Sequence, residues 1–310
     1  MLKYNVHINS FTPNIESIII YDLFVASLGY EKRSVFCSKH FTIQSDYKIV
    51  DAFSYKKELN YEENRAWYAE NDFNIVEFGE DIEFYITDEK IVRITTALNI
   101  KKTIRIGVDI SSMSRRKIAL WLEYFISILD SDIIVVDYYY SIAPIYGSCV
   151  EHYPIRYSGP VTPYFAGWIP NIDIPLSTVI GLGYDPVKSV GICELLETTN
   201  IYAYLPLFED LVQSEVIAIS NKELFDWMKR MNVNGKVYKY HVDMPYSTFI
   251  DIQSLTYSLD RAVFIPFGPK VFALISMLVS LIYYPKVSVW RVSSAENDEA
   301  IDRIPSGEVI

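Results

Sequence analysis

The tetrapeptide Leu28-Gly29-Tyr30-Glu31 returns as Leu182-Gly183-Tyr184-Asp185, 154 residues farther along the chain. The dipeptide Ala119-Leu120 returns as Ala273-Leu274 at the same offset of 154 residues. Each tetrapeptide closes an apolar run, and each dipeptide lies in an apolar segment that follows a polar turn. Two matches at one offset indicate a duplicated unit of about 150 residues, which is a usual domain size.

Strand-like apolar runs alternate with helix-like segments around both copies of the repeat. In the first half, strands are predicted at 18–27, 48–53, 74–78, 103–110 and 133–140, helices at 31–41, 62–71 and 115–129, and a strand followed by a helix at 81–95. In the second half, strands are predicted at 178–182, 201–205, 216–219, 236–241, 262–266 and 287–292, and helices at 187–197, 222–231, 249–259 and 271–283. Such alternation predicts parallel sheets with right-handed crossovers. We therefore expect an α/β fold of two tandem Rossmann-like parallel-sheet units that form a pseudo-dimer.

These patterns divide the chain into three parts. Residues 1–142 are the first predicted Rossmann-like unit, and residues 176–310 are the second, which ends in a polar, acidic tail that we expect to be loose. Residues 143–175 between them are rich in proline and aromatic residues. We interpret this segment as a structured linker, because a flexible linker would carry fewer aromatic side chains.

Composition excludes several classes of protein. Half of the 310 residues are apolar, and the net charge of −11 argues against direct binding to duplex nucleic acid. Three widely spaced cysteines without a Cys-x-x-Cys pair, and four unclustered histidines, predict a reducing cytoplasm and no metal site. The longest apolar stretch, 271–284, is shorter than the roughly 20 residues of a membrane helix. We expect a cytoplasmic protein with no membrane contact.

Four turns each follow a predicted strand and open a predicted helix. Ligands of open α/β sheets bind beyond the carboxyl ends of the strands, where the free N–H groups of helix starts suit phosphate. Glycine permits close approach of the backbone, and Ser, Arg and Lys bind phosphate oxygens. The candidate ligand-binding residues are Ser27, Gly29, Tyr30, Ser111, Ser112, Ser114, Arg115, Gly181, Gly183, Tyr184, Gly268 and Lys270. Simple turns and helix caps would use the same residue types, and this alternative stays open.

Two acids are candidates for catalysis, Asp109 and Glu31. Asp109 ends a predicted strand just before two serines, where it suits a ribose contact, general-base work, or acceptance of N–H groups from its own turn. No complete P-loop occurs, and the third glycine of a dinucleotide fingerprint that begins at Gly181 is replaced by Pro186. We therefore expect no bound cofactor.

One further spacing is of interest. Arg33 and His40 are separated by six residues. This Arg-x6-His spacing resembles the catalytic motif of all-helical HEPN ribonucleases, although it lies here within a predicted α/β unit.

The two-unit plan, with Phe267-Gly268-Pro269-Lys270 and Ser111-Ser112-Met113-Ser114-Arg115 as strand-to-helix turns, resembles the CRISPR-associated Rossmann-fold sensors and, more closely, the SAVED domains. The first turn is similar to a degenerate Gly-Gly-Thr-Lys turn of those families. The resemblance implies a cleft between two units that binds a cyclic oligonucleotide. It also implies a separate partner protein for the output, because no effector domain is recognised in the chain.

The leading hypothesis is therefore a nucleotide- or phosphate-ligand-binding sensor or accessory subunit of a prokaryotic antiviral defence system, and we favour this non-enzymatic role over an enzyme. One alternative is an enzyme that acts on a nucleotide or its glycosidic bond, with Asp109 or Glu31 as acid or base. Another is a protein-interaction subunit with a degenerate cleft, which the 25 tyrosines favour.

Overall fold

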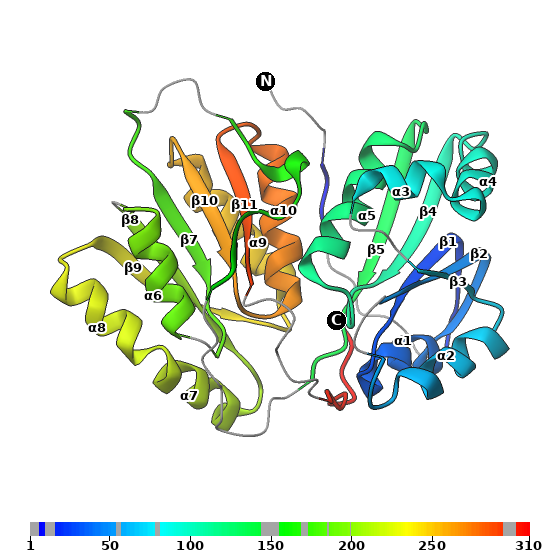
Figure 1. Cartoon of the computed structure of the whole chain (residues 1–310), viewed down its shortest axis with the longest axis horizontal. Coiled ribbons are helices and arrows are strands. Elements are labelled where there is room, and N and C mark those ends of the chain that lie inside the picture. Colours follow the sequence, from blue (N-terminus) through cyan, green and yellow to red (C-terminus); the bar gives the residue numbers. More distant parts are fainter. Residues whose placement is uncertain are drawn as a thin grey trace. The chain divides into compact units, whose positions relative to one another are not determined.

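The computed structural model describes residues 6–9, 16–53, 57–77, 81–143, 155–168, 173–184, 186–198, 200–293 and 302–310. The chain forms two compact units (Figure 1). The N-terminal unit consists of 12–145 together with 299–310, and the C-terminal unit consists of 146–298 together with 1–11. Both are α/β units built on a largely or wholly parallel sheet, as the alternating pattern of the sequence predicts.

The sheet of the N-terminal unit has five parallel strands in the order β3-β2-β1-β4-β5. The strands are β1 (Ile18–Leu28), β2 (Thr42–Ala52), β3 (Asn74–Glu77), β4 (Thr103–Asp109) and β5 (Ile133–Tyr139). Between them lie the 3-10 helix η1 (Lys32–Val35) and helices α1 (Phe36–His40), α2 (Tyr61–Glu70), α3 (Ile82–Thr87), α4 (Glu89–Leu98) and α5 (Arg115–Ser127).

The sheet of the C-terminal unit has six strands in the order β6-β11-β10-β7-β8-β9, with β6 antiparallel to β11 and the others parallel. The strands are β6 (Tyr157–Pro160), β7 (Ser177–Gly181), β8 (Asn200–Leu207), β9 (Asn234–His241), β10 (Ala262–Pro266) and β11 (Val287–Ser293). The helices are η2 (Pro163–Phe165), α6 (Pro186–Leu195), α7 (Leu211–Ser220), α8 (Lys222–Arg230), α9 (Pro245–Tyr257) and α10 (Lys270–Ile282).

The five consecutive parallel strands of the two sheets follow the same order. Reading β7, β8, β9, β10 and β11 as first to fifth, both sheets are arranged 3-2-1-4-5. Helices α5 and α10 occupy the same place in this order and both have 13 residues. The shared order fits the repeat in the sequence, while common descent of the two halves stays a prediction.

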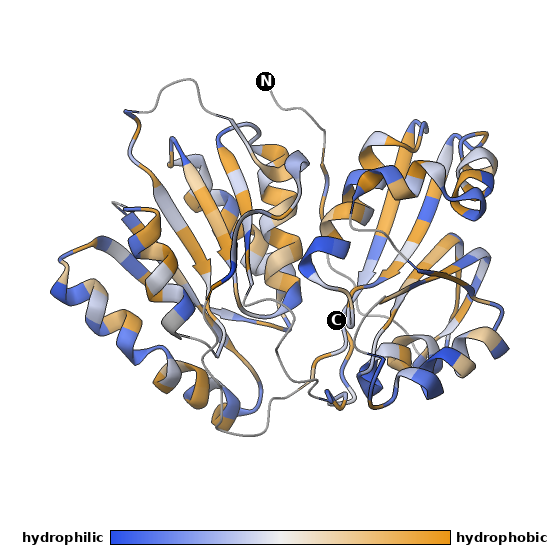
Figure 2. Cartoon of the chain, viewed as in Figure 1, coloured by the Kyte–Doolittle hydropathy of each residue, from blue (hydrophilic) through white to orange (hydrophobic). Residues whose placement is uncertain are grey.

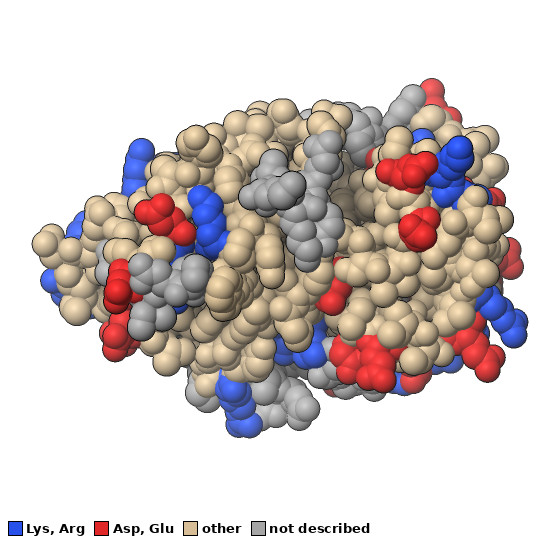
Figure 3. Space-filling model, turned by 90° about the horizontal axis from the view of Figure 1, so that it is seen from above, with Lys and Arg blue, Asp and Glu red and all other residues tan. Residues whose placement is uncertain are grey.

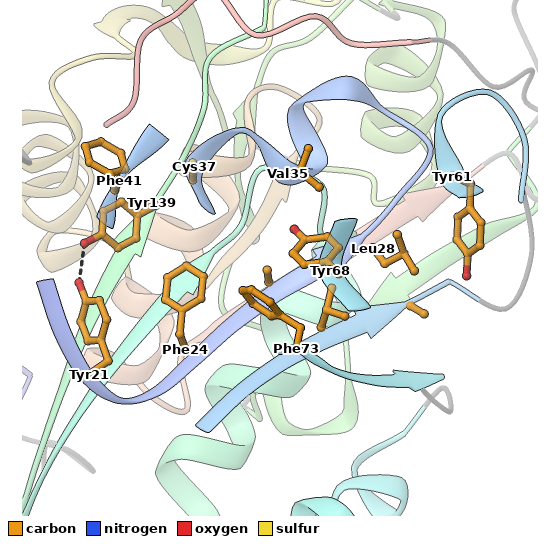
Figure 4. Packing of buried hydrophobic residues seen from close by; sticks show 13 residues of the cluster. Tyr21, Phe24, Leu28, Val35, Cys37, Phe41, Tyr61, Tyr68, Phe73 and Tyr139 are labelled. Atoms are coloured by element: carbon orange, nitrogen blue, oxygen red, sulfur yellow. Dashed lines mark hydrogen bonds between the residues drawn. The ribbon is translucent and has the colours of Figure 1, made fainter. Parts of the chain in front are cut away.

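Apolar residues alternate with polar ones along most helices and fill the central strands (Figure 2). One core cluster lies on a face of the N-terminal sheet and is largely aromatic (Figure 4). In it Tyr21 and Tyr139, from β1 and β5, join their hydroxyl groups at 2.5 Å, and Phe24 packs beside both rings. A Cβ on Gly107 would lie 2.6 Å from the Phe24 ring, so this strand position needs glycine for the rings to pack. Many tyrosines are thus core residues.

Three secondary-structure predictions differ from the structure. Residues 216–219, predicted as a strand, belong to helix α7. The segment 81–95 contains helices α3 and α4 and no strand, because Asp88 caps α4 through its side chain and so divides one apolar stretch into two helices. The helix predicted at 31–41 is a 3-10 turn followed by the short helix α1.

The C-terminal tail belongs to a different unit from the one that the sequence predicts. The sequence places it in the second unit as a loose segment, whereas the structure groups 299–310 with the N-terminal unit. Val309 forms an antiparallel bridge with Ser141 and packs against the aromatic core cluster. An apolar side chain and backbone pairing therefore anchor a tail whose average composition is polar.

The predicted linker also contains regular structure. Within 143–175, strand β6 pairs with β11 and extends the C-terminal sheet, while 144–154 and 169–172 lie outside the described residues. No helix in the described part of the chain has the length and apolar character needed to cross a membrane.

Candidate anion site in the N-terminal unit

Strands β1 and β4 are neighbours at the centre of the N-terminal sheet. The connection after β1 leads to β2 on one side, and the connection after β4 leads to β5 on the other. Their carboxyl ends therefore form the topological switch point, which is where open α/β sheets bind ligands. The loops that follow these two strands meet there, because a Cβ on Gly29 would lie 3.3 Å from the Cβ of Ser112. The structure thus brings together the candidate residues of two separate turns.

The loop after β1 is held by hydrogen bonds from buried side chains. The amide of Gly29 donates to Ser34 Oγ at 3.1 Å, and Ser34 Oγ donates to the carbonyl oxygen of Ser27 at 2.7 Å. Asn64, which is 3% exposed in α2, donates through Nδ2 to the carbonyl oxygens of Gly29 at 2.9 Å and Glu31 at 3.0 Å. These hydrogen bonds fix the backbone of this loop.

The other two candidates in this loop have polar contacts of their own. Ser27 is buried in β1 and donates through Oγ to the carbonyl oxygen of Asp51 at 3.1 Å. Tyr30 is half-buried, packs against the aromatic core cluster, and accepts at its carbonyl oxygen from the side chain of Asn60 at 3.1 Å. Both residues support the loop, and Tyr30 is the more exposed of the two.

The loop after β4 uses Asp109 and Ser111 as internal supports. Asp109, which is 1% exposed, accepts the amide of Ser111 on Oδ1 at 2.9 Å. Ser111 Oγ in turn accepts the amide of Ser141 at 2.8 Å. Ser114 is the N-cap of α5, and its Oγ accepts the amide of Lys117 at 3.1 Å. Asp109 thus accepts an N–H group of its own turn, which is one of the roles that the sequence suggests for it.

Ser112 is also buried in this loop. Its side chain is 8% exposed, and its Oγ has no hydrogen-bond partner among the described residues. Burial of a hydroxyl group without a partner costs about 1–3 kcal/mol. The main-chain amides of Ser112 and Ser114 likewise donate to none of the described residues. A buried hydroxyl and these N–H groups thus lie at the start of a 13-residue helix, where the helix dipole favours an anion.

Three basic residues occupy the first turn of α5. Arg115 and Arg116 begin α5, and its first turn carries no acid. Lys117 extends back to β2, where Nζ hydrogen-bonds to the carboxylate of Asp51 and lies 3.8 Å from the centre of the Phe53 ring. On the face drawn in Figure 3, Lys and Arg are interspersed with Asp and Glu, in keeping with the net charge of −11. The carboxylate of Asp51 offsets the charge of Lys117, and the first turn of α5 also contains Arg115 and Arg116.

Burial changes the pKa of both members of the Asp51–Lys117 pair. Burial raises the pKa of Asp51 to about 7, although Lys117 and Trp121 lower it. Burial also lowers the pKa of Lys117, against the attraction of Asp51. This ion pair connects the first turn of α5 to the carboxyl end of β2 and thereby supports the loop that contains Ser112.

Glu31 and Arg33 form a nearly buried ion pair with Oε2 and Nε 2.5 Å apart. Arg33 also lies 5.9 Å from the ring centre of Tyr140. The His40 ring instead stacks on Phe36, with 5.1 Å between centres. The resemblance to all-helical ribonucleases is therefore wrong for this segment, because the unit is a parallel-sheet fold and the two side chains have different neighbours.

The equivalent loops of the C-terminal unit use their glycines and amides internally. The carbonyl oxygen of Gly181 accepts the amides of Phe267 at 2.8 Å and Gly268 at 2.9 Å. A Cβ on Gly268 would lie 2.2 Å from the carbonyl oxygen of Leu182. Pro269, which has no N–H, precedes Lys270 at the start of α10. The amides of Phe267 and Gly268, just before α10, thus already donate within the unit, and Pro269 has no amide hydrogen to donate.

Gly183 and Tyr184 are anchored in a similar way. Asn221, which is fully buried, donates through Nδ2 to the carbonyl oxygen of Gly183 at 2.7 Å. The Tyr184 hydroxyl accepts from Gln213 Nε2 at 3.0 Å. Asn221 thus repeats in the C-terminal unit the contact that Asn64 makes to Gly29.

The residues that organise the N-terminal site were not recognisable as a group in the sequence. Each of the supporting residues is a single polar residue with no motif around it. Asn64 and Ser141 lie 35 and 30 residues from their partners Gly29 and Ser111, and Ser34 is separated from Gly29 by a turn. Asp51 offered the clearest signal, since it is an acid within the apolar run that forms the end of β2. A single acid in such a run requires a buried partner.

Comparisons with known proteins add no family assignment. No protein-family model matches the chain, and no curated protein matches its sequence at a significant level. Within the described residues, no group of three or more His, Cys, Asp or Glu side chains is arranged to hold a metal ion.

Proposed function

We propose that the N-terminal unit binds a phosphate-bearing ligand of the nucleotide class at the loops after β1 and β4. The observation that carries this proposal is Ser112, whose buried Oγ has no partner among the described residues and lies beside Gly29 at the start of α5. A phosphate oxygen at this position would accept from the hydroxyl group and from the amides of the turn, and the helix dipole would favour its charge.

We further propose that the ligand is bound without being turned over. Asp109 accepts the amide of its own turn, and Glu31 is paired with Arg33, so both candidate acids have structural roles. These contacts support a sensor or accessory subunit over an enzyme. The role in prokaryotic antiviral defence, with a cyclic oligonucleotide as ligand and a separate effector protein, rests on the resemblance to CRISPR-associated Rossmann-fold sensors and SAVED domains.

Calorimetry with inorganic pyrophosphate and with cyclic tri- and tetra-adenylate tests the binding proposal. Ser112→Ala should weaken binding about tenfold, the scale of one hydrogen bond to a charged group. It should not lower the thermal midpoint and should raise it slightly, because the buried hydroxyl group has no partner to lose and its burial is unfavourable. Thr178→Val is the matched control, since it removes another fully buried hydroxyl without a described partner, in β7.

Two outcomes would reject this site. One is that the wild-type chain binds none of these probes. The other is that Ser112→Ala binds them as tightly as the wild type does. Chromatography of the probes after incubation with the wild-type chain separates sensor from enzyme, because a sensor returns them unchanged.

A further inference from the structure

Residues 302–310, here called the C-terminal strap, pair with the chain just beyond the carboxyl end of β5. Tyr140 and Ile310 exchange two backbone hydrogen bonds, at 2.8 and 3.0 Å. Ile142 donates to the carbonyl oxygen of Glu308 at 3.2 Å and accepts the amide of Ser306 at 2.8 Å. The strap therefore adds an antiparallel segment to the edge of the N-terminal sheet, on the extension of its last strand.

The other end of the strap contacts η1, which follows the loop after β1. The amide of Arg33 donates to the carbonyl oxygen of Arg303 at 3.2 Å. The amide of Lys32 donates to Asp302 Oδ1 at 2.9 Å, and the ammonium group of Lys32 lies 3.7 Å from Asp302 Oδ2. A single segment of nine residues thus holds two parts of the N-terminal unit that are more than 100 residues apart in the sequence.

Both contact regions lead directly to the candidate anion site. In η1, Ser34 follows Arg33 and accepts the amide of Gly29 on its Oγ. On the other side, Ser141 bridges to Val309 and donates its amide to Ser111 Oγ. One hydrogen bond therefore separates each contact region of the strap from one of the two loops of the site.

We propose that the C-terminal strap is a positioning element that sets the geometry of the two loops, so that docking of the strap and occupancy of the anion site are thermodynamically linked. This linkage rests on the proposed function, whereas the positioning of the loops does not. An anion bound between the loops would favour the strap-docked geometry, and by reciprocity a docked strap would strengthen anion binding by the same factor. The strap follows β11 in the sequence and belongs to the N-terminal unit.

Gly307→Ala disturbs the strap without a steric clash. Gly307 has a φ of +102°, a backbone conformation that alanine rarely adopts, and a Cβ there would meet no atom within 4 Å. Gly191→Ala in α6 is the matched control, because its Cβ would meet only Ile155 Cδ1 at an ordinary 3.6 Å.

Hydrogen exchange on the full chain measures the positioning directly. In Gly307→Ala, the amides of Tyr140 and Ile142 should exchange about tenfold faster than in the wild type, the factor that corresponds to about 1.4 kcal/mol of local opening. The amides of Gly29 and Ser111 should also exchange faster, although they have no bond to the strap itself. Gly191→Ala should change none of these four rates. Unchanged rates at Gly29 and Ser111, with faster exchange at Tyr140 and Ile142, would overturn the proposal.

Pyrophosphate binding then tests the linkage. Gly307→Ala should weaken pyrophosphate binding several-fold, and saturating pyrophosphate should slow exchange at Tyr140 and Ile142 of the wild type. Equal affinity in Gly307→Ala and the wild type would overturn the linkage and leave the anion site standing. If the wild type binds no pyrophosphate, the anion site fails and the linkage fails with it, while the exchange experiment still decides whether the strap positions the loops.

Discussion

Lys117 in the first turn of α5 is paired with Asp51 at the carboxyl end of β2, and both side chains are almost completely removed from solvent. The ammonium group of Lys117 also lies 3.8 Å from the centre of the Phe53 ring, and Phe53 lies beside Gly29. The pair therefore connects three elements at the carboxyl edge of the N-terminal sheet. Its energetic role can be measured separately from ligand binding.

Lys117→Met should destabilise the fold by about 3–5 kcal/mol at pH 8, because it leaves the buried carboxylate of Asp51 without its cation. The double variant Asp51→Asn, Lys117→Met should recover most of this loss, since both charges are then absent. Urea unfolding measures the three free energies. Equal stability of Lys117→Met and the double variant would show that the pair is not coupled as the structure indicates.

The raised pKa of Asp51 predicts the direction of a pH effect. Between the ordinary aspartate pKa near 4 and about 7, the folded state binds more protons at Asp51 than the unfolded state does. Asp51 therefore contributes stability below pH 4 that is lost as the pH rises toward 7, by about 1.4 kcal/mol for each unit of pKa difference. In Asp51→Asn the free energy of unfolding should fall less between pH 4 and 7 than in the wild type. An identical fall in both proteins would contradict the shift.

Asn64→Ala should cost about 1–3 kcal/mol of stability, because the buried carbonyl oxygen of Gly29 and the partly buried one of Glu31 lose their shared donor. Asn221→Ala should have a similar effect through Gly183. Asn74→Ala is the control, since its hydrogen bond to Lys48 is exposed to solvent. Thermal unfolding of the three variants provides the comparison, and equal midpoints for Asn64→Ala and Asn74→Ala would refute this role.

Replacement by alanine should reduce stability much more at Gly268 in the C-terminal unit than at Gly29 in the N-terminal unit. Gly268→Ala places a Cβ 2.2 Å from the carbonyl oxygen of Leu182, so backbone must move, and we expect a loss of several kcal/mol or failure to fold. Gly29→Ala meets the Ser112 Cβ at 3.3 Å, so the loop after β4 must give by only a few tenths of an ångström to relieve the contact. Its stability should change by less than about 1 kcal/mol. Circular dichroism during heating measures both, and a larger loss for Gly29→Ala would reverse our interpretation.

The variant Asp109→Asn tests whether Asp109 has a structural role or a catalytic one. Asparagine keeps an oxygen that can accept the amide of Ser111, so folding and probe binding should survive. If the chain is a sensor, neither the wild type nor the variant converts a nucleotide. Turnover by the wild type that falls about 100-fold or more in Asp109→Asn, the usual scale of a lost acid–base group, would support the enzyme instead.

The sequence predicts an element of this fold well where its apolar pattern is long enough to show a clear period. Strands β1, β4 and β5 and helix α5 have long, regular patterns, and the sequence places them within a few residues of their observed bounds. The apolar run at 216–219 resembles a strand because it is short, yet it forms part of α7 once Asp210 caps that helix. Short runs carry too few residues to distinguish a period of two from one of 3.6.

The candidate site was predictable only in outline. Glycine and serine after a strand mark the loops after β1 and β4, and the strand order then brings Gly29 to Ser112. Which serine lacks a partner depends on contacts from residues distant in the sequence, such as Ser141 to Ser111. No local sequence pattern predicts such contacts. The strap is the clearest example, because its composition is mostly polar and yet Val309 packs against the aromatic core cluster.

The return of the strap to the N-terminal unit also determines the order in which the chain can finish folding. The ribosome makes residues 12–145 before 146–298, yet the sheet of the N-terminal unit gains its last edge segment only when 302–310 emerge. The unit made first is therefore completed last. During synthesis the backbone of Tyr140 and Ile142 stays open to other extended chains for that interval, so it is the place where a chaperone or a neighbouring nascent chain would compete with correct assembly.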